Sequence, residues 1–336
     1  MREMNILITA ASRRVALIQA FSQALKRLGL KGNVITTDMN DLSPGLYFGS
    51  KHYIVPLTTD IQYIPIIKSI CFKERIHLLI PTIDDELPLF GRHAEEFLTT
   101  GIRVAVSNEH TSHICNDKYA TAVFFESRGI PFARTWLPEQ LSFPQLQYPM
   151  FLKPRNGRGS VGAFMIRNER ELLFFLDYVP DAVVQEYLNG KEYTIDLLAD
   201  FSGNVISVVP RERMVIRSGV TDRGQTLYHP EMIRLAVSAA SALDIRGPAN
   251  IQVKLDGETA KIFEINPRFS GGIPLTIGAG ADFPAWLIEM CLGRRVRSCI
   301  GKFRDRLIMA CYESAVFLPD DEAREVKIEV AKRMGV

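Results

Sequence analysis

The sequence predicts a mixed fold, in which an α/β domain with a parallel sheet precedes an α+β module with antiparallel sheets. Residues 5–107 alternate short apolar strands with amphipathic helices, a pattern typical of a parallel sheet covered on both faces. From residue 191 onward the expected strands are longer and follow one another closely, which favours antiparallel pairing. The 336 residues allow two or three domains, and we place boundaries near residues 110 and 188, which gives segments 1–110, 111–188 and 189–336.

The first segment is expected to alternate strands and helices along its whole length. The helix over residues 15–28 is amphipathic and stops at Gly29, a residue suited to the left-handed conformation that ends many helices. We expect the other elements to be strands at 5–11, 33–37, 52–56, 76–81 and 103–106 and helices at about 61–74 and 87–99.

The two later segments are expected to hold more strands than helices. One helix covers residues 116–128 and ends at Gly129, and Asp256-Gly257 is a typical hairpin turn. We expect further helices at 169–177 and about 229–243, and strands at 149–153, 163–167, 182–186, 192–200, 204–210, 250–256 and 260–266.

Composition excludes several classes of protein. The hydrophobic fraction of 47% and the net charge of +2 are ordinary, so we expect neither nucleic acid nor a membrane as a partner. No apolar run approaches the ~20 residues of a membrane span. The 5 cysteines are widely spaced and lack a C-x-x-C pair, which favours reduced thiols and a cytoplasmic location.

Residues 157–162 match G-x-G-x-x-G, a pattern shared by several nucleotide-binding folds. A dinucleotide-binding loop requires a helix directly after it, but residues 163–166 are strand-like, so the loop is expected to join two strands. Such a hairpin is either a flexible surface loop or a flap whose backbone amides face phosphate oxygens. Two lysines precede it. Lys153 ends an apolar strand, and Lys118 begins a helix, where a cation opposes the helix dipole. Each is either a surface residue or a cation directed at the site.

Glu264, Asn266 and Gln252 form a candidate metal site. Side chains alternate along a strand, so Glu264 and Asn266 are expected on one face while Phe263 and Ile265 face the core. The hairpin turn brings Gln252 beside Glu264. One carboxylate and two amides suit Mg²⁺, which takes oxygen ligands and completes its shell with phosphate oxygens. The alternative is a polar solvent face on an edge hairpin.

Three groups of residues are candidates for the transferred group and the substrate. Arg268 follows the metal-site strand and is placed to hold a phosphoryl group. Arg211 and Arg213 either clamp a carboxylate or form a solvated pair, and Ser270 begins a glycine-containing segment that offers backbone donors. Three acids after the fourth strand either bind an amine or open the next helix: Asp84, Asp85 and Glu86.

The order of these motifs carries more information than any one of them. Along the chain come Asn-Asp-Lys at 116–118, Phe-Leu-Lys-Pro at 151–154, the glycine loop, Gln-Glu-Tyr-Leu at 185–188, Gly-Lys-Glu-Tyr at 190–193, and finally Glu-Ile-Asn-Pro-Arg at 264–268. Together they resemble the ATP-grasp superfamily, in the branch of the carbamoyl-phosphate synthase large subunit. The resemblance implies a pre-ATP-grasp domain over 1–110 and a small lid lobe with a glycine-rich flap over 111–188. Residues 189–336 would form a large lobe with the Mg²⁺-binding hairpin and a C-terminal extension.

The resemblance also implies residue roles. Lys118 and Lys153 would contact nucleotide phosphates, Glu192 would bind the ribose, and Arg268 would steady the γ-phosphate. Gln252, Glu264 and Asn266 would hold Mg²⁺, with Mn²⁺ as an alternative, and Gln252 replaces an acid found in many relatives. Arg268, Lys118 and Arg211 are the residues assigned to catalysis. The remaining nucleotide contacts would come from Gly157, Gly159, Ser160, Val161, Gln185, Glu186, Tyr187 and Leu188.

The activity implied by the resemblance is an ATP- and Mg²⁺-dependent carboxylate–amine ligase. Such an enzyme makes an acyl phosphate, lets an amine or another nucleophile displace phosphate, and releases ADP. Its partners would be small-molecule carboxylate and amine substrates, and a homodimer is compatible with the sequence. Two alternatives remain open: a kinase for a small carbamate-like acid, and a non-catalytic ATP-binding subunit.

Overall fold

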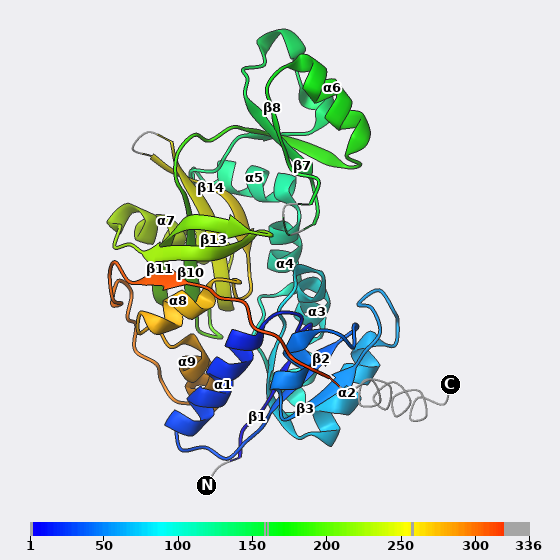
Figure 1. Cartoon of the computed structure of the whole chain (residues 1–336), viewed down its shortest axis with the longest axis vertical. Helices are drawn as coiled ribbons and strands as arrows, with labels where there is room; N and C mark the ends of the chain where they lie inside the picture. The colour runs from blue at the N-terminus through cyan, green and yellow to red at the C-terminus, as the bar shows by residue number, and fades with distance from the viewer. Residues whose placement is uncertain (1–2, 158, 160, 257–258, 319–336) are drawn as a thin grey trace. The chain divides into compact units, whose positions relative to one another are not determined.

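The computed structural model describes residues 3–157, 159, 161–256 and 259–318. The chain folds into two compact units (Figure 1). Of the described residues, the first contains 3–106, 282–297 and 311–318, and the second contains those within 107–281 and 298–310. No helix in the described ranges is long and apolar enough to cross a membrane.

The first unit is built on a five-stranded sheet whose pairings are all parallel. The strands lie in the order β3-β2-β1-β4-β5, so the sheet reverses its direction of growth between β1 and β4. This confirms the parallel sheet that strand–helix alternation predicted. The strands are β1 (Asn5–Ile8), β2 (Val34–Asp38), β3 (Lys51–Ile54), β4 (Ile76–Ile80) and β5 (Arg103–Val104).

The helices of the first unit include one from late in the chain. Arg27 of α1 forms an ion pair with Asp282, and the thiol of Cys291 donates to the carbonyl of His77 at 3.3 Å. Residues 282–297, within segment 189–336, therefore pack with the first unit. Its helices are α1 (Val15–Arg27), α2 (Tyr63–Lys73), α3 (Leu87–Thr99) and α9 (Phe283–Cys291), with 3-10 turns η1 (Pro44–Phe48) and η2 (Asp84–Glu86).

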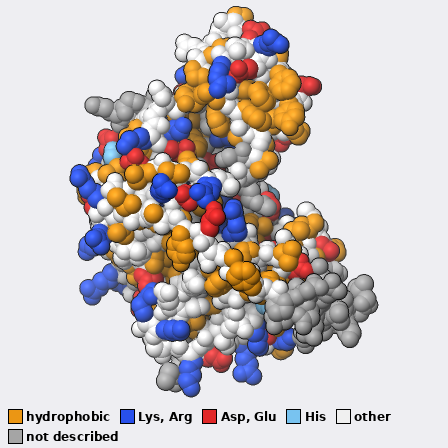
Figure 2. Space-filling model, viewed as in Figure 1, with side chains coloured by type: hydrophobic (Ala, Val, Ile, Leu, Met, Phe, Trp, Pro, Cys, Tyr) orange, Lys and Arg blue, Asp and Glu red, His pale blue; other side chains and the backbone are white. Residues whose placement is uncertain are grey.

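The smaller lobe of the second unit is a four-stranded antiparallel sheet in the order β6-β9-β7-β8. Helix α6 packs on it through Leu172 and Phe175, while Phe174 and Tyr178 remain exposed, and Figure 2 shows hydrophobic side chains gathered on this lobe. The lobe consists of β6 (Thr135–Trp136), β7 (Met150–Pro154), β8 (Phe164–Ile166), α6 (Glu169–Tyr178) and β9 (Ala182–Glu186).

The larger lobe is a six-stranded sheet in the order β14-β13-β10-β11-β12-β15, paired antiparallel throughout. Helix α7 (Pro230–Ala242) covers the core of this sheet with Met232, Ala236 and Ala239. The lobe also holds β10 (Glu192–Ala199), β11 (Val205–Arg217), β12 (Val220–Thr226), β13 (Gly247–Asp256), β14 (Thr259–Asn266), α8 (Ile273–Gly278) and β15 (Ile308–Ala310).

The helix predicted over residues 116–128 is present, but it begins at Lys118 and ends at Glu126, and the helix before it was not predicted. The chain forms two helices, α4 (Glu109–Asn116) and α5 (Lys118–Glu126), which are separated at Asp117. Asp117 has extended dihedral angles, and its Oδ1 accepts from the amides of Tyr119 and Ala120 at 3.0 Å each. The aspartate therefore caps α5, which turns Lys118 into the first residue of a new helix.

Candidate functional site

Glu264 lies between the two amides that the sequence had grouped with it. In the β13–β14 hairpin Gln252 is the register partner of Glu264. Glu264 Oε1 accepts from Gln252 Nε2 at 3.2 Å and from Asn266 Nδ2 at 3.1 Å. The expected juxtaposition of these three side chains is confirmed. The Asp256-Gly257 turn assigned to the hairpin extends into residues outside the described part of the chain.

A β-bulge in β14 changes one prediction about this hairpin. The register shifts between Gln252 and Val253, so Ile262 and Ile265 both reach the core although they lie an odd number of positions apart in the strand. Phe263 was expected in that core. Instead, its ring lies 5.6 Å from Lys153 Nζ and forms a cation–π contact. The extra residue of the bulge explains this, because it reverses which side chains face the core.

Lys153 is buried beside the carboxylate–amide group, with a relative exposure of 5%. Its Nζ donates to Gln185 Oε1 at 3.0 Å and to the carbonyl of Phe263 at 3.2 Å. Burial lowers the pKa of Lys153 to about 8, while the charge of Glu264 opposes this shift and Lys118 adds to it. The lysine is therefore a core-facing cation and not a surface residue.

Lys118 connects α5 to the glycine loop. Its Nζ donates to the carbonyl of Gly157 at 2.9 Å and to that of Arg155 at 3.4 Å, and its relative exposure is 8%. Arg155 in turn forms a two-donor ion pair with Asp117, through Nε at 2.9 Å and Nη2 at 2.6 Å. Sequence reasoning missed this pair, although an aspartate before a helix start is a recognisable cap signal.

The glycine loop joins two antiparallel strands, β7 and β8, as expected. Gly157 and Gly159 have φ angles of 121° and 70°, in the region that favours glycine. Val161 is 79% exposed, so its side chain is open to solvent. Ser160 lies outside the described residues, and its predicted nucleotide contact stays a prediction.

The predicted adenine hinge follows β9. Glu186 accepts from the amide of Arg134 at 2.8 Å and from Lys261 Nζ at 3.2 Å, so its carboxylate is held within the protein. Lys254 Nζ lies 5.4 Å from the ring of Tyr187 and donates to the carbonyl of Leu188 at 3.4 Å. The segment runs from the small lobe into β10, which is the position a hinge would occupy.

Glu192 and Arg213 form an ion pair inside the site. Arg213 Nη1 lies 2.5 Å from Glu192 Oε1 and 3.2 Å from Gln252 Oε1. Its side chain is 5% exposed, which rules out the solvated pair with Arg211 that the sequence left open. The strand predicted to end at residue 210 continues to Arg217, because Arg211 and Arg213 find carboxylate partners on β10 and can enter the sheet.

Arg211 is fully buried, and its Nη1 has no hydrogen-bond partner among the described residues, so its assigned contact with substrate stays a prediction. Its Nε and Nη2 bind Asp196 at 2.7 and 3.2 Å, and Nη2 also bonds Ser270 Oγ at 3.0 Å. Asp196 neutralises the guanidinium, which therefore holds the segment that follows Arg268. Arg268 Nη1 donates to the carbonyl of Phe269 at 3.1 Å, and Nη2 lies 3.4 Å from Asn266 Oδ1.

The acids at 84–86 belong to the first unit and differ in exposure. Glu86 is 1% exposed and accepts hydrogen bonds from the hydroxyls of Tyr63 and Thr9. Burial raises the pKa of Glu86 to about 7, and the hydrogen bonds oppose that shift. Glu86 is thus an internal acceptor, Asp84 is also buried, and Asp85 is exposed.

The carboxylate–amide group fits the chemistry of Mg²⁺. Within the described residues, no group of three or more His, Cys, Asp or Glu side chains could hold a metal ion. In the group of Gln252, Glu264 and Asn266, the carboxylate comes from Glu264 and the other two side chains are amides. Turning the amides of Gln252 and Asn266 exchanges N for O. Their oxygens would then lie about 3 Å from Glu264 Oε1, close to the spacing of neighbouring ligands around Mg²⁺. The turn would break the contacts of these amide oxygens with Arg213 and Arg268.

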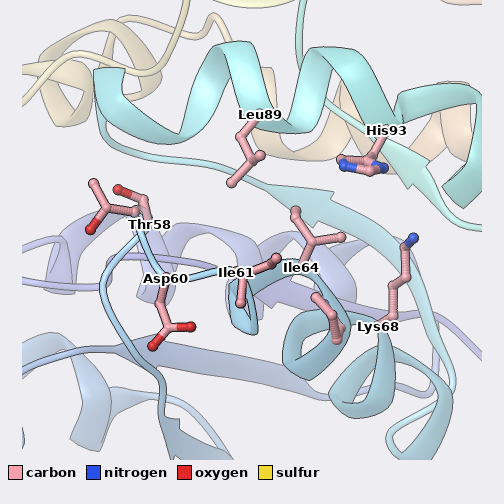
Figure 3. Close-up of a pocket in the computed structure, with 9 residues that line it drawn as sticks. Thr58, Asp60, Ile61, Ile64, Lys68, Leu89 and His93 are labelled. Atoms are coloured by element: carbon pink, nitrogen blue, oxygen red, sulfur yellow. The ribbon is translucent and has the colours of Figure 1, made fainter.

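A separate hollow of about 690 Å³ lies in the first unit, between the segment that precedes α2 and helix α3 (Figure 3). Ile61, Ile64 and Leu89 give it an apolar lining, and Lys68 and His93 lie at its edge. None of the predicted site residues lines it.

Two family models match successive parts of the chain. Residues 6–105 match the model described as PylC-like, N-terminal domain. Residues 178–314 match the model described as ATP-grasp in the biosynthetic pathway with Ter operon.

Curated relatives match at low identity. The D-alanine–D-alanine ligase of Petrotoga mobilis is 26% identical over 184 residues, which cover 49% of this chain and 61% of that protein. The carbamoyl phosphate synthase large chain of Thermotoga maritima is 26% identical over 276 residues, which cover 74% of this chain but 25% of that protein. The chain thus spans less than two thirds of each relative.

Solved structures share the fold. The biotin carboxylase domain of Hydrogenobacter thermophilus 2-oxoglutarate carboxylase, in complex with MgADP and bicarbonate, superposes with a TM-score of 0.72 at 17% identity and covers 90% of this chain and 73% of that one. The L-amino acid ligase of Bacillus licheniformis gives a TM-score of 0.67 at 20% identity and covers 87% and 75%. The chain therefore holds an ATP-grasp domain over residues 178–314 that follows a PylC-like N-terminal domain over residues 6–105.

Proposed function

We propose that this protein is an ATP- and Mg²⁺-dependent ligase that activates a small-molecule carboxylate as an acyl phosphate for attack by an amine. One observation carries the proposal: two buried lysines and a carboxylate–amide group lie in one site of the second unit, with Lys153 close enough to Glu264 for their charges to interact. Relatives and structural neighbours that are named as ligases of amino acids support it.

In the proposed reaction the chain's own residues bind and orient, and no side chain acts as a nucleophile. Lys118 and Lys153 attract the phosphates, and Arg268 steadies the γ-phosphoryl group as its bond to ADP breaks and a bond to the carboxylate oxygen forms. The amine nitrogen then attacks the acyl carbon, loses a proton and releases phosphate. A metal ion bound by Gln252, Glu264 and Asn266 would neutralise charge on the phosphate oxygens.

The glycine loop has a further part in the proposal. An acyl phosphate reacts with water, so its site must close during turnover. Lys118 already links α5 to the carbonyls of Arg155 and Gly157 on either side of the loop's start. We propose that this contact holds the loop near the nucleotide phosphates and keeps water from the intermediate.

Product analysis tests the function. The protein is incubated with ATP, Mg²⁺ and pooled amino acids, and we expect ADP and phosphate to appear only when an amino acid mixture is present. AMP and pyrophosphate would contradict the acyl-phosphate route. ADP release with bicarbonate and ammonia alone would instead favour the carbamate-like kinase.

A matched pair of variants tests the metal group. We expect Glu264→Ala to lose at least about 100-fold in kcat, which corresponds to about 3 kcal/mol of transition-state stabilisation. Glu231→Ala, on the exposed surface of α7, should keep full turnover, because its side chain is 58% exposed. Full turnover in Glu264→Ala would remove the metal assignment.

A further inference from the structure

Arg213 contacts two strands and one turn of the second unit at the same time. Its Nη1 binds Glu192 on β10 and Gln252 on β13, and its Nη2 donates to the carbonyl of Gly219 at 2.7 Å. Gly219 lies in the turn between β11 and β12. One guanidinium therefore joins the proposed nucleotide and metal residues to a turn that the sequence did not associate with the site.

The charge of Arg213 lies where the proposed site requires positive charge. Burial lowers the pKa of Arg213, but Glu192 and Glu264 oppose that shift. The guanidinium holds Gln252 Oε1, the same oxygen that a metal ion between Gln252 and Glu264 would need. A metal ion and Arg213 therefore compete for one oxygen atom.

The β11–β12 turn also reaches the two loops that border the site. A Cβ atom at Gly219 would lie 3.2 Å from the Cα of Gly159 in the glycine loop, so the two backbones are in close contact. A Cβ atom at Gly271 would lie 2.6 Å from Val220 Cγ1, so Val220 rests directly on the segment that follows Arg268. The turn thus bridges the glycine loop and the segment after Arg268.

We propose that Arg213 is a positioning residue that couples metal binding at Gln252 to the placement of the β11–β12 turn against the glycine loop. When Gln252 turns its oxygen to the metal, Arg213 gives up that bond and keeps Glu192 and Gly219. The turn thereby keeps its contact with Gly159 while the nucleotide is bound. This inference rests on the proposed function, because it takes Mg²⁺ with a nucleotide as the ligand.

Hydrogen exchange of the whole protein tests the coupling without requiring turnover. In the wild type, MgADP should slow amide exchange severalfold in a peptide that covers residues 214–222. In Arg213→Ala that peptide should exchange faster without ligand, and MgADP should no longer slow it. Arg213→Lys keeps the charge but presents a single donor group, so it should still bind MgADP while its turn exchanges as fast as in Arg213→Ala.

A matched control lies on the same hairpin. Arg223→Ala removes a cation with a 63% exposed side chain on β12 and should leave both exchange and the response to MgADP unchanged. The coupling is overturned if MgADP slows exchange of the 214–222 peptide equally in the wild type and in both Arg213 variants. It is also overturned if MgADP slows exchange of this peptide in none of the three proteins while it still protects β14. Failure of the wild type to bind MgADP at all, with no protection of β14, would instead overturn the proposed function.

Discussion

At the scale of single residues, Lys153 gives the site a pH dependence. Burial lowers its pKa to about 8, with Glu264 opposing the shift. The ammonium form, which attracts phosphate, is therefore nearly complete about one pH unit below this value and is lost above it. We expect kcat/KM for ATP to fall about tenfold per pH unit above pH ~8, because kcat/KM reports the ionisation of the free enzyme.

Two lysine substitutions check this assignment. In Lys153→Arg the new side chain stays charged at every pH used, so the fall of kcat/KM at alkaline pH should move above pH ~10. Lys191→Arg changes a lysine whose side chain is 68% exposed, and the fall of kcat/KM should still begin at pH ~8. A flat profile up to pH ~9.5 in the wild type would mean that the charge of Lys153 is not needed.

The candidate site was predictable where a residue's type and strand position determine its neighbours. Gln252 and Glu264 were expected side by side because a hairpin fixes its own register. Phe263 was wrongly predicted to face the core, because the amino-acid sequence gives no sign of the β-bulge beside it. The ion pair of Arg211 with Asp196 was not predicted for a different reason: Asp196 lies on another strand, and the pairing of β10 with β11 brings the two together.

At the scale of elements, the connection between α4 and α5 depends on Asp117. It caps α5 and holds Arg155 at the start of the glycine loop. We expect Asp117→Ala to lower the free energy of unfolding by about 1–2 kcal/mol, since it removes the cap and the partly exposed ion pair together. Asp117→Asn keeps a capping oxygen and should lose less than about 1 kcal/mol. Urea unfolding compares the two variants, and equal losses would show that the cap contributes nothing.

Among elements, amphipathic helices and buried strands were predicted well, whereas short or polar ones were not. Helix α3 begins and ends where its apolar spacing indicated. Strand β6 has 2 residues, which is too short for any periodicity to show. Strand β12 contains Asp222, Arg223 and Gln225, and no strand was predicted there. Pairing with β11 and β15, and not residue preference, makes it a strand.

At the scale of the whole molecule, the chain returns to its first unit before the six-stranded sheet of the second unit is complete, because β15 follows residues 282–297. Helix α9 packs against α1 and β4, and it buries Phe283, Leu287 and Ile288. The apolar surface of the first unit is thus completed by residues more than 170 positions away from residue 106. The packing of α9 with the first unit could not be predicted from the sequence, because the hydrophobicity of α9 suits either unit equally well.

Leu287→Ala tests which unit α9 stabilises. Leu287 is fully buried, and its truncation should cost about 3 kcal/mol through lost burial and a residual cavity. That loss should accelerate hydrogen exchange in β1 and β4 of the first unit while β10 and β13 of the second keep wild-type rates, because a local destabilisation spreads through one cooperative unit. Leu197→Ala, at an equally buried position of β10, should give the opposite pattern. Faster exchange of β10 and β13 in Leu287→Ala would place α9 with the larger lobe, where the sequence alone had put it.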